Sequence, residues 1–305
     1  MERIKQALEK ARLERQVSGG YPGDTAAATR KDASPSTVTY SLTRTVEVSK
    51  DLMKDKRIVS EYEQGGFSDA YKMLRTQVLQ RLREKGWNSL AVTSPGVNEG
   101  KTLTAINLAI SLSMEVNYTV LLVDADLRHP SVHTYFGIEA EQGLSEYLTD
   151  NRPLSELLIH PANIPGFVIL PGGKPLINSA ELLSSPKMIK LVEELKSRYP
   201  SRLVVFDLPP LLNAADALAF SPFVDAALLV IEEGKSARED VRNAVGLLQS
   251  TNLIGTVLNK SLTGTSDAGS TIREATSIKW LERYAERFLL YYQVLRQRLS
   301  RLRKG

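Results

Sequence analysis

The sequence predicts an α/β protein built around a mostly parallel, doubly wound β-sheet, with flanking helices towards the N- and C-terminal ends of the chain. Short apolar runs without polar alternation recur from residue 88 onward, which is typical of strands that are buried on both faces. Segments with helical periodicity lie between most of these runs, as expected because parallel strands need crossover connections. A chain of 305 residues is long enough for one large domain of this class.

The N-terminal part of the chain is expected to lie outside the sheet. Residues 1–16 have apolar side chains at helical spacing and are predicted to form a short amphipathic helix. Residues 17–60 are predicted to form a flexible linker, because Ser, Thr, Gly, Ala and Pro dominate much of the segment. A helix over Ser68–Lys85 follows, and its apolar face consists of Tyr71, Leu74, Val78 and Leu82.

The predicted domain spans residues 61–262. Helices are expected between most of its strands, for example over Thr102–Val116 and Pro186–Arg198. Residues 272–305 are predicted to form a basic amphipathic helix, which packs either on its own domain or on an oligomer partner. The predicted strands are Leu90–Thr93, Val120–Val123, Phe167–Leu170, Leu203–Phe206, Ala226–Ile231 and Gly255–Leu258.

Composition excludes several classes of function. The chain has no cysteine, which excludes disulfides, thiolate metal sites, iron–sulfur clusters and cysteine nucleophiles. No run approaches the roughly 20 apolar residues that cross a bilayer, so a cytoplasmic location is predicted. The net charge is +4, and residues 296–304 hold five basic side chains and no acidic one. This end either contacts an anionic membrane or is a solvated helix end.

A phosphate-binding loop is predicted after the first strand of the domain. Leu90–Thr93 runs into Ser94–Thr102 and then into a helix, which is the order of elements in a P-loop. Backbone N–H groups of such a loop point at phosphate oxygens. Lys101 is expected to reach the β- and γ-phosphates of ATP, and the Thr102 hydroxyl to bind Mg²⁺. The residues expected to bind the nucleotide are Pro95, Gly96, Val97, Asn98, Glu99, Gly100, Lys101, Thr102 and Leu103.

Carboxylates follow two further strands of the predicted sheet. Asp124 and Asp126 come directly after Val120–Val123, and Asp207 follows Leu203–Phe206. Because ligands of open parallel sheets bind at the carboxyl ends of the strands, we expect these side chains to converge on the phosphate loop. Carboxylates in such a place hold magnesium or orient an attacking group.

Together these motifs resemble those of the bacterial tyrosine kinases, which belong to the P-loop ATPases with deviant Walker motifs, as do the chromosome-partitioning proteins. The resemblance covers roughly residues 68–260 and implies the P-loop NTPase type of sheet. The resemblance depends on the loop ending in Gly-Lys-Thr, on a second motif of three apolar residues followed by Asp-x-Asp-x-Arg, and on a strand that ends in Asp-x-Pro-Pro. Further matching segments are Asp124–Pro130, Gly143–Leu148, Leu170–Gly173, Glu181–Leu183 and Val257–Lys260.

The resemblance implies an ATP- and Mg²⁺-dependent tyrosine autokinase that regulates the synthesis and export of exopolysaccharide or capsule. A membrane-embedded chain-length regulator is the implied activating partner, and no nucleic acid is expected. The implied location is the inner face of the plasma membrane, reached through that partner. The implied catalytic residues are Lys101, Asp124 and Asp126, the metal ligands Thr102, Asp124 and Asp207, and the adenine contact Asn259.

The family also has a helix with the motif Glu-x-x-Arg-x-x-Arg, which joins subunits into a ring. The corresponding residues here are Asp69, Lys72 and Arg75, so charge is kept while the residue type changes at two positions. Lysine lacks the planar fork of arginine and cannot make the same bidentate contact. A homo-oligomer is therefore expected with an altered interface.

The chain departs from the family pattern at three places. Val97-Asn98 replaces Pro-Gly in the loop, where asparagine is a residue that tolerates left-handed backbone. Leu208 stands where the family has a hydroxyl residue, and the chain lacks a dense C-terminal tyrosine cluster. The alternatives are a P-loop switch whose nucleotide state controls assembly, or an ATP-binding adaptor without catalysis. Positioning ATPases carry a signature lysine where this chain has Gly96. The C-terminal tyrosines are Tyr284, Tyr291 and Tyr292.

Overall fold

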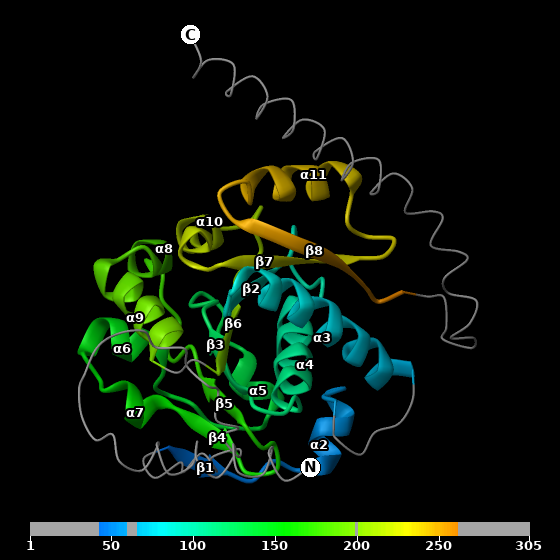
Figure 1. Ribbon diagram of the computed structural model, residues 1–305. Coiled ribbons are helices and arrows are strands. Elements are labelled where there is room, and N and C mark those ends of the chain that lie inside the picture. The colour runs from blue at the N-terminus through cyan, green and yellow to red at the C-terminus, as the bar shows by residue number, and fades with distance from the viewer. Residues whose placement is uncertain (1–42, 60–65, 199–200, 262–305) are drawn as a thin grey trace, which may run out of the picture. The chain divides into compact units, whose positions relative to one another are not determined.

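The computed structural model describes residues 43–59, 66–198 and 201–261, which belong to one compact unit (Figure 1). The strands are β1 (Arg44–Val46), β2 (Ser89–Thr93), β3 (Thr119–Asp124), β4 (Ile159–Pro161), β5 (Phe167–Leu170), β6 (Arg202–Asp207), β7 (Ala226–Glu232) and β8 (Asn252–Asn259). The helices are α2 (Lys50–Asp55), α3 (Gly66–Lys85), α4 (Lys101–Ser113), α5 (Val132–Tyr135), α6 (Leu144–Asp150), α7 (Leu154–Leu157), α8 (Ser179–Leu183), α9 (Pro186–Ser197), α10 (Asp216–Phe220), the 3₁₀ turn η1 (Ser221–Phe223) and α11 (Arg238–Leu247).

The strands form a single mixed sheet in the order β1-β4-β5-β3-β6-β2-β7-β8. The six strands from β5 to β8 in this order run parallel. The short strands β1 and β4 pair parallel with each other, while β4 pairs antiparallel with β5. The prediction of a mostly parallel α/β sheet is therefore confirmed, with an antiparallel addition at one edge.

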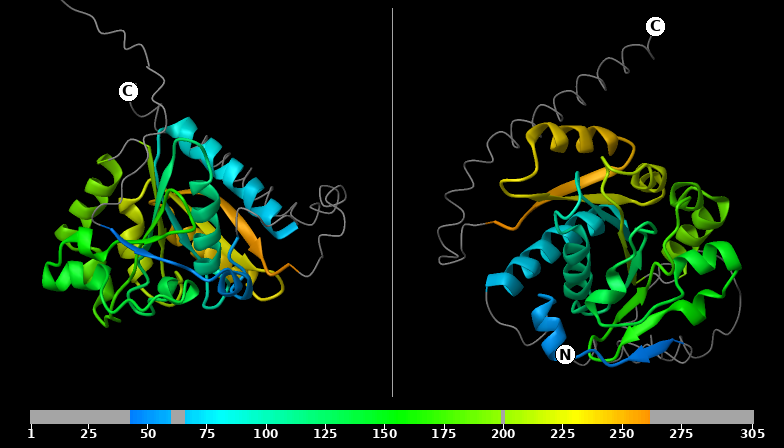
Figure 2. Two further views of the ribbon diagram at one scale, coloured as in Figure 1. Left: turned by 90° about the horizontal axis from the view of Figure 1, so that it is seen from below. Right: turned by 180° about the vertical axis from the view of Figure 1, so that it is seen from behind.

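Alternate side chains of the parallel strands enter two separate cores. On β2, Leu90 and Val92 belong to the first core, whereas Ala91 belongs to the second. Helices α3 and α4 cover the first face, and α9, α10 and α11 cover the second (Figure 2). Burial on both faces explains why the strand sequences read as continuous apolar runs.

The linker predicted over residues 17–60 differs from the structure between residues 43 and 59. This stretch contains β1 and α2, and its last residues are fastened to α4 by the Asn107 side chain. The Asn107 amide accepts from Val59 N–H at 2.9 Å and donates to the Arg57 carbonyl at 2.9 Å. The folded unit therefore begins before residue 61, because a few apolar residues hidden in a polar segment reach the first core. These buried residues are Val48, Met53, Ile58 and Val59.

Other predicted elements lie at or near their expected positions. The helix expected over Ser68–Lys85 begins at Gly66, and Tyr71, Val78 and Leu82 of its predicted apolar face are buried. The helix expected to end at Val116 ends at Ser113. Within the described ranges no helix is long and apolar enough to cross a membrane. The predicted helices over 1–16 and 272–305, the linker residues 17–42 and the basic residues 296–304 lie outside the described residues.

Candidate functional site: a phosphate loop facing buried carboxylates

The predicted phosphate loop connects β2 to α4. Two of its residues have left-handed backbone, Asn98 with φ 61° and Gly100 with φ 91°. The expectation that asparagine supports the altered loop is confirmed at Asn98. A side chain at Gly100 would place its Cβ 2.0 Å from the Asn259 Nδ2 atom, and side chains rarely adopt a φ of 91°, so both features favour glycine there. The loop leads directly into the N-terminus of α4, as an anion-binding loop should.

Strand register brings the acidic strand ends beside this loop. Asp124 and Asp207 are paired residues at the ends of β3 and β6, and Asp207 is also level with Val92 of β2. The Lys101 Nζ atom lies 2.8 Å from Asp126 Oδ2 and 3.6 Å from Asp207 Oδ1. The predicted convergence of the three aspartates on the loop is thus present in the structure.

Burial gives these charged groups shifted pKa values. Burial lowers the pKa of Lys101, but the charges of Asp207 and Asp126 outweigh it and leave the pKa raised. Burial raises the pKa of Asp207 against the opposing charge of Lys101. Burial, together with the charge of Asp207, raises the pKa of Asp124 to about 7. Such values are typical of functional sites, where charges are held out of water.

Most of the hydrogen-bonding capacity of Asp124 holds the following loop in place. Its Oδ2 atom accepts from the N–H groups of Ser131 at 2.8 Å and Val132 at 2.9 Å. Its Oδ1 atom accepts one longer bond, from Asp126 N–H at 3.3 Å. The Oδ1 atom therefore retains the weaker protein contact and is the side of the carboxyl with capacity for a further partner.

Asp207 has the features of a metal ligand. Among the described residues neither carboxylate oxygen has a hydrogen-bond partner, although the side chain is completely buried. The one charged partner of Asp207 among these residues is Lys101 at 3.6 Å, and a buried carboxylate without full hydrogen bonding is stabilised further by a bound cation. No cluster of three or more acidic, His or Cys side chains forms a metal site within the described ranges. Mg²⁺ in nucleotide sites uses only one or two protein ligands besides phosphate and water, so Asp207 and the Thr102 hydroxyl fit such an ion.

Glu99 stabilises the loop from within and on its outer side. Its Oε2 atom accepts from Gly96 N–H at 3.0 Å, and its Oε1 atom accepts from the Ser236 hydroxyl. The Asn259 Nδ2 atom donates to the Glu99 carbonyl at 2.9 Å. In this structure the predicted adenine contact Asn259 therefore supports the phosphate loop directly.

Two exposed lysines hold the outer edge of the loop. Lys235 Nζ donates to the Val97 carbonyl at 3.1 Å, and Lys260 Nζ donates to the Asn98 carbonyl at 2.7 Å. Both lysines also pair with Glu232 at the end of β7. The contacts of Lys235, Glu232 and Ser236 with the loop were not predicted from the sequence. The rule that sites form at the carboxyl ends of strands points to the turn that follows β7, where these residues lie.

Two other motif segments meet beside the carboxylates. The Glu146 Oε2 atom accepts from Gly143 N–H at 2.7 Å, and its Oε1 atom accepts from Lys174 N–H at 3.3 Å. A Cβ at Gly173 would lie 2.1 Å from Glu146 Oε2, and a Cβ at Gly172 would lie 3.3 Å from Asp124 Cγ. Glu146 thus holds a glycine-rich loop closely against Asp124. No sequence rule identified this contact in advance.

The remaining predicted features contribute in other ways. Leu208 is fully buried in the second core, so its side chain adds no polar group to the site. Arg75, at one of the predicted ring positions, is engaged within the chain: its Nε atom lies 3.0 Å from Glu115, and it also donates to the Ser111 carbonyl. The tyrosines at 284, 291 and 292 lie outside the described residues.

Comparisons with known proteins place the chain in a family. A family model described as an AAA domain matches residues 92–263. Tyrosine-protein kinase YwqD of Bacillus subtilis is 35% identical over 205 residues, which are 66% of this chain and 85% of YwqD. Tyrosine-protein kinase etk of Escherichia coli K12 is 31% identical over 204 residues, which are 66% of this chain. The matched region spans only 28% of etk, and 24% of the putative tyrosine-protein kinase EpsB of Ralstonia solanacearum.

Solved structures show the same fold. The kinase domain of the Escherichia coli tyrosine kinase ETK superposes with a TM-score of 0.62 at 29% identity, covering 74% of this chain and 91% of that domain. The VpsO kinase domain superposes with a TM-score of 0.57 at 31% identity, covering 64% of this chain and 96% of that domain.

Proposed function

This chain belongs to the bacterial tyrosine kinase family of P-loop ATPases, and we propose that it transfers the γ-phosphoryl group of ATP to tyrosine in a system that regulates exopolysaccharide or capsule production. The observation that carries the proposal is the buried group of Lys101, Asp126 and Asp207 beside the phosphate loop. Two relatives that are 35% and 31% identical to this chain are tyrosine-protein kinases.

Each residue of the site has a distinct role in this proposal. The N–H groups of the loop and the Lys101 ammonium bind the phosphates and stabilise charge that develops during transfer. Thr102 and Asp207 would hold Mg²⁺, which would neutralise the charge of the phosphates. Asp124 accepts the proton of the attacking tyrosine hydroxyl at Oδ1, since a pKa of about 7 suits a general base near neutral pH.

The wider assignment follows from the family. We assign the protein to the cytoplasmic face of the membrane, where a membrane-embedded chain-length regulator activates it and where several copies assemble. The proposed oligomer uses the α3 surface. There Lys72 pairs with Asp69 at 2.9 Å on the exposed side, while Arg75 stabilises its own subunit. Conversion of one ring arginine to lysine leaves a weaker, point-charge contact at that position.

The test is phosphotransfer that depends on Lys101. Full-length protein incubated with γ-labelled ATP, Mg²⁺ and the activator should form phosphotyrosine, and Lys101→Met should reduce it at least about 100-fold through lost phosphate stabilisation. Lys190→Met is the matched control, because Lys190 is exposed on α9 away from the loop.

The outcome also separates the alternative functions. Lys101-dependent ATP hydrolysis without phosphotyrosine would identify a P-loop switch, and tight ATP binding without turnover would identify an adaptor. Leu208 is the observation that favours these alternatives, because it places an aliphatic side chain where the family has a hydroxyl next to the magnesium ligand.

A further inference from the structure

Arg128 is held rigidly at the edge of the site through one of its three guanidinium nitrogens. Its Nε atom lies 2.9 Å from Asp216 Oδ2, and the Asp216 side chain is completely buried. The Ser179 hydroxyl donates to the other oxygen of the same carboxylate. A buried carboxylate with two fixed partners orients the arginine that pairs with it.

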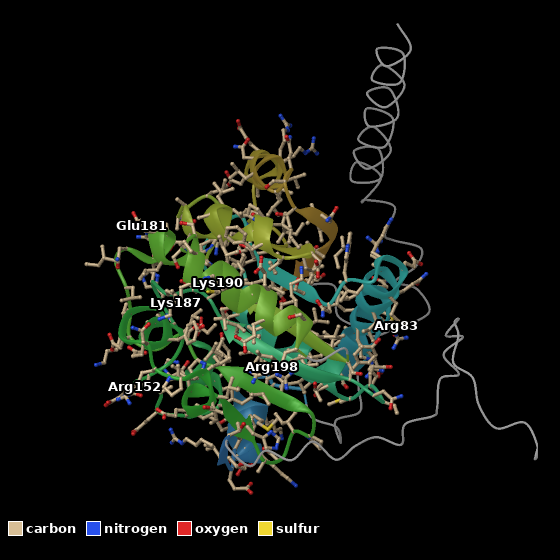
Figure 3. The ribbon with its side chains drawn as sticks, turned by 60° about the vertical axis from the view of Figure 1, so that its left-hand side comes forward. Arg83, Arg152, Glu181, Lys187, Lys190 and Arg198 are labelled. Atoms are coloured by element: carbon tan, nitrogen blue, oxygen red, sulfur yellow. The ribbon has the colours of Figure 1, made fainter. Side chains whose placement is uncertain are left out.

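The two terminal nitrogens of Arg128 point to no other group within the described part of the chain. The structure gives them no hydrogen bond and no second ion pair, and the side chain is 38% exposed. Two basic residues labelled in Figure 3, Arg198 and Lys187, have their terminal nitrogens engaged within the chain. Arg198 pairs with Glu194 at 2.6 Å, and Lys187 donates to backbone carbonyls at the end of α6. Arg128 is thus an oriented cation whose two terminal nitrogens have no partner among the described residues.

The position of Arg128 places this fork beside the phosphate site. It lies two residues after Asp126, the partner of Lys101, in a turn closed by His129 N–H donating to Asp126 Oδ1 at 3.2 Å. Asp216 comes from the segment that follows Asp207 on β6. The Arg128–Asp216 pair therefore joins the segments that follow β3 and β6, the two strands that end in the site carboxylates Asp124 and Asp207.

Exposed apolar side chains lie on the loops that flank Arg128. The Leu176 N–H group donates to the Leu127 carbonyl at 2.8 Å, and the next residue, Ile177, is 93% exposed. Leu212, on the loop between Asp207 and Asp216, is partly exposed, and its N–H group donates to the Pro95 carbonyl at 3.1 Å. An oriented guanidinium on a surface whose neighbouring loops carry exposed apolar groups suits a polypeptide with an anionic side chain more than it suits a nucleotide.

We propose that Arg128 is a specificity-determining residue that binds an oxyanion on the tyrosine-bearing polypeptide, either a carboxylate next to the acceptor tyrosine or the phosphate of a phosphotyrosine. Guanidinium binds both groups in the same bidentate manner. This inference rests on the proposed kinase function, because it names the polypeptide that the same site receives.

The experiment measures peptide binding without turnover, using the full-length protein loaded with Mg²⁺ and a non-hydrolysable ATP analogue. Fluorescence anisotropy compares three otherwise identical peptides, with Glu residues around tyrosine, with Gln residues around tyrosine, and with Gln residues around phosphotyrosine. The wild-type protein should bind at least one anionic peptide about tenfold more tightly than the neutral one, as a charged hydrogen bond provides. Lys190→Gln, which removes an exposed cation on α9, should leave this preference unchanged.

Two variants of Arg128 test the assignment. Arg128→Gln should abolish the preference, and Arg128→Lys should reduce it to about threefold, because lysine keeps the charge but lacks the fork. Arg128→Lys also keeps a cation beside buried Asp216, so its result stands even if Arg128→Gln unfolds. Preference for the Glu peptide identifies the carboxylate, and preference for the phosphotyrosine peptide identifies the phosphate.

Three results would overturn the inference. They are an unchanged preference in Arg128→Lys, the absence of any preference in the wild-type protein, and an equal loss of binding to all three peptides in the variants. A parallel phosphotransfer assay keeps it separate from the proposed function. Phosphotyrosine formation without an Arg128-dependent preference rejects only the role of Arg128. An Arg128-dependent preference without phosphotyrosine rejects only the kinase assignment.

Discussion

Lysine–carboxylate groups lie on both sides of the phosphate loop, and they differ in burial far more than in distance. On the inner side Lys101 lies 2.8 Å from Asp126, with the lysine side chain only 12% exposed. On the outer side Lys260 lies 3.0 Å from Glu232, with the lysine side chain 48% exposed. The same pair of chemical groups at nearly the same separation is buried in one place and solvated in the other.

The pKa shifts of one carboxyl on each side, Asp207 near Lys101 and Glu232 near Lys260, run in opposite directions. On the inner side burial raises the pKa of Asp207 despite the nearby Lys101. On the outer side the hydrogen bond from Lys260 lowers the pKa of Glu232, because little desolvation opposes it. The comparison teaches that burial outweighs a nearby lysine at Asp207, whereas at Glu232 the lysine hydrogen bond outweighs burial.

The largest expected effect is that of Asp207→Asn, which removes a carboxylate on the buried side. Turnover of Mg·ATP should fall about 100-fold or more, since the ion loses an anionic ligand. The melting temperature without nucleotide should stay the same or rise, because burial already disfavours the charged form of this group. Steady-state ATP turnover and thermal melting measure the two quantities.

Glu232→Gln is the outer-side control for this variant and should change turnover less than about twofold, because the lysines that pair with Glu232 are about half exposed. A change of similar size in both variants would remove the distinction between buried and solvated carboxylates.

The next effect concerns stability and pH, and it comes from Asp124. Its pKa is raised from 3.8 to about 7 on folding, so the native state holds this proton more tightly than the unfolded state. Its contribution to stability is therefore present below pH 4 and is lost as the pH rises through 7. A tenfold change in an acid dissociation constant corresponds to about 1.4 kcal/mol of free energy.

Asp124→Asn should make the free energy of unfolding fall less steeply between pH 5 and 8 than in wild type. Urea unfolding of the nucleotide-free protein at several pH values measures this slope. Parallel curves for the two proteins would show that Asp124 is ionised throughout this range in the folded state.

The smallest expected effect is on the outer side. Lys235→Met and Lys260→Met should each weaken ATP binding less than about threefold, because solvated ion pairs contribute little. The difference from wild type should shrink further at 0.5 M salt, where such charges are screened. Titration with a fluorescent ATP analogue measures the affinity. A loss of more than tenfold in either variant would mean that these lysines contact the nucleotide itself.

Long apolar strands could be predicted from the sequence, and short ones could not. The predicted strand Leu203–Phe206 is observed as Arg202–Asp207, because a run that is buried on both faces has no polar interruption. Strand β4 has only three residues, Ile159 to Pro161, and contains a histidine and a proline, so it carries no such pattern. Its pairing with β1 depends on packing from distant parts of the chain.

The loop and the carboxylates of the candidate site could be predicted because each lies at a strand end. The contacts that support them could not. Arg128 and Asp216 are 88 positions apart, and Asn259 meets Glu99 across 160 positions. No local pattern relates such residues, since their proximity is set by the order of strands in the sheet.

The amino-acid sequence by itself determined the phosphate loop, the lysine within it and the acidic strand ends. These features are local, because a strand, a glycine-containing turn and a helix N-terminus follow from neighbouring residues. Only the tertiary structure decided that Lys101, Asp126 and Asp207 are buried while Lys260 is about half exposed and Glu232 partly exposed. Burial depends on which helices cover the sheet edge, and the resulting loss of water sets the pKa values that distinguish the two sides of the loop.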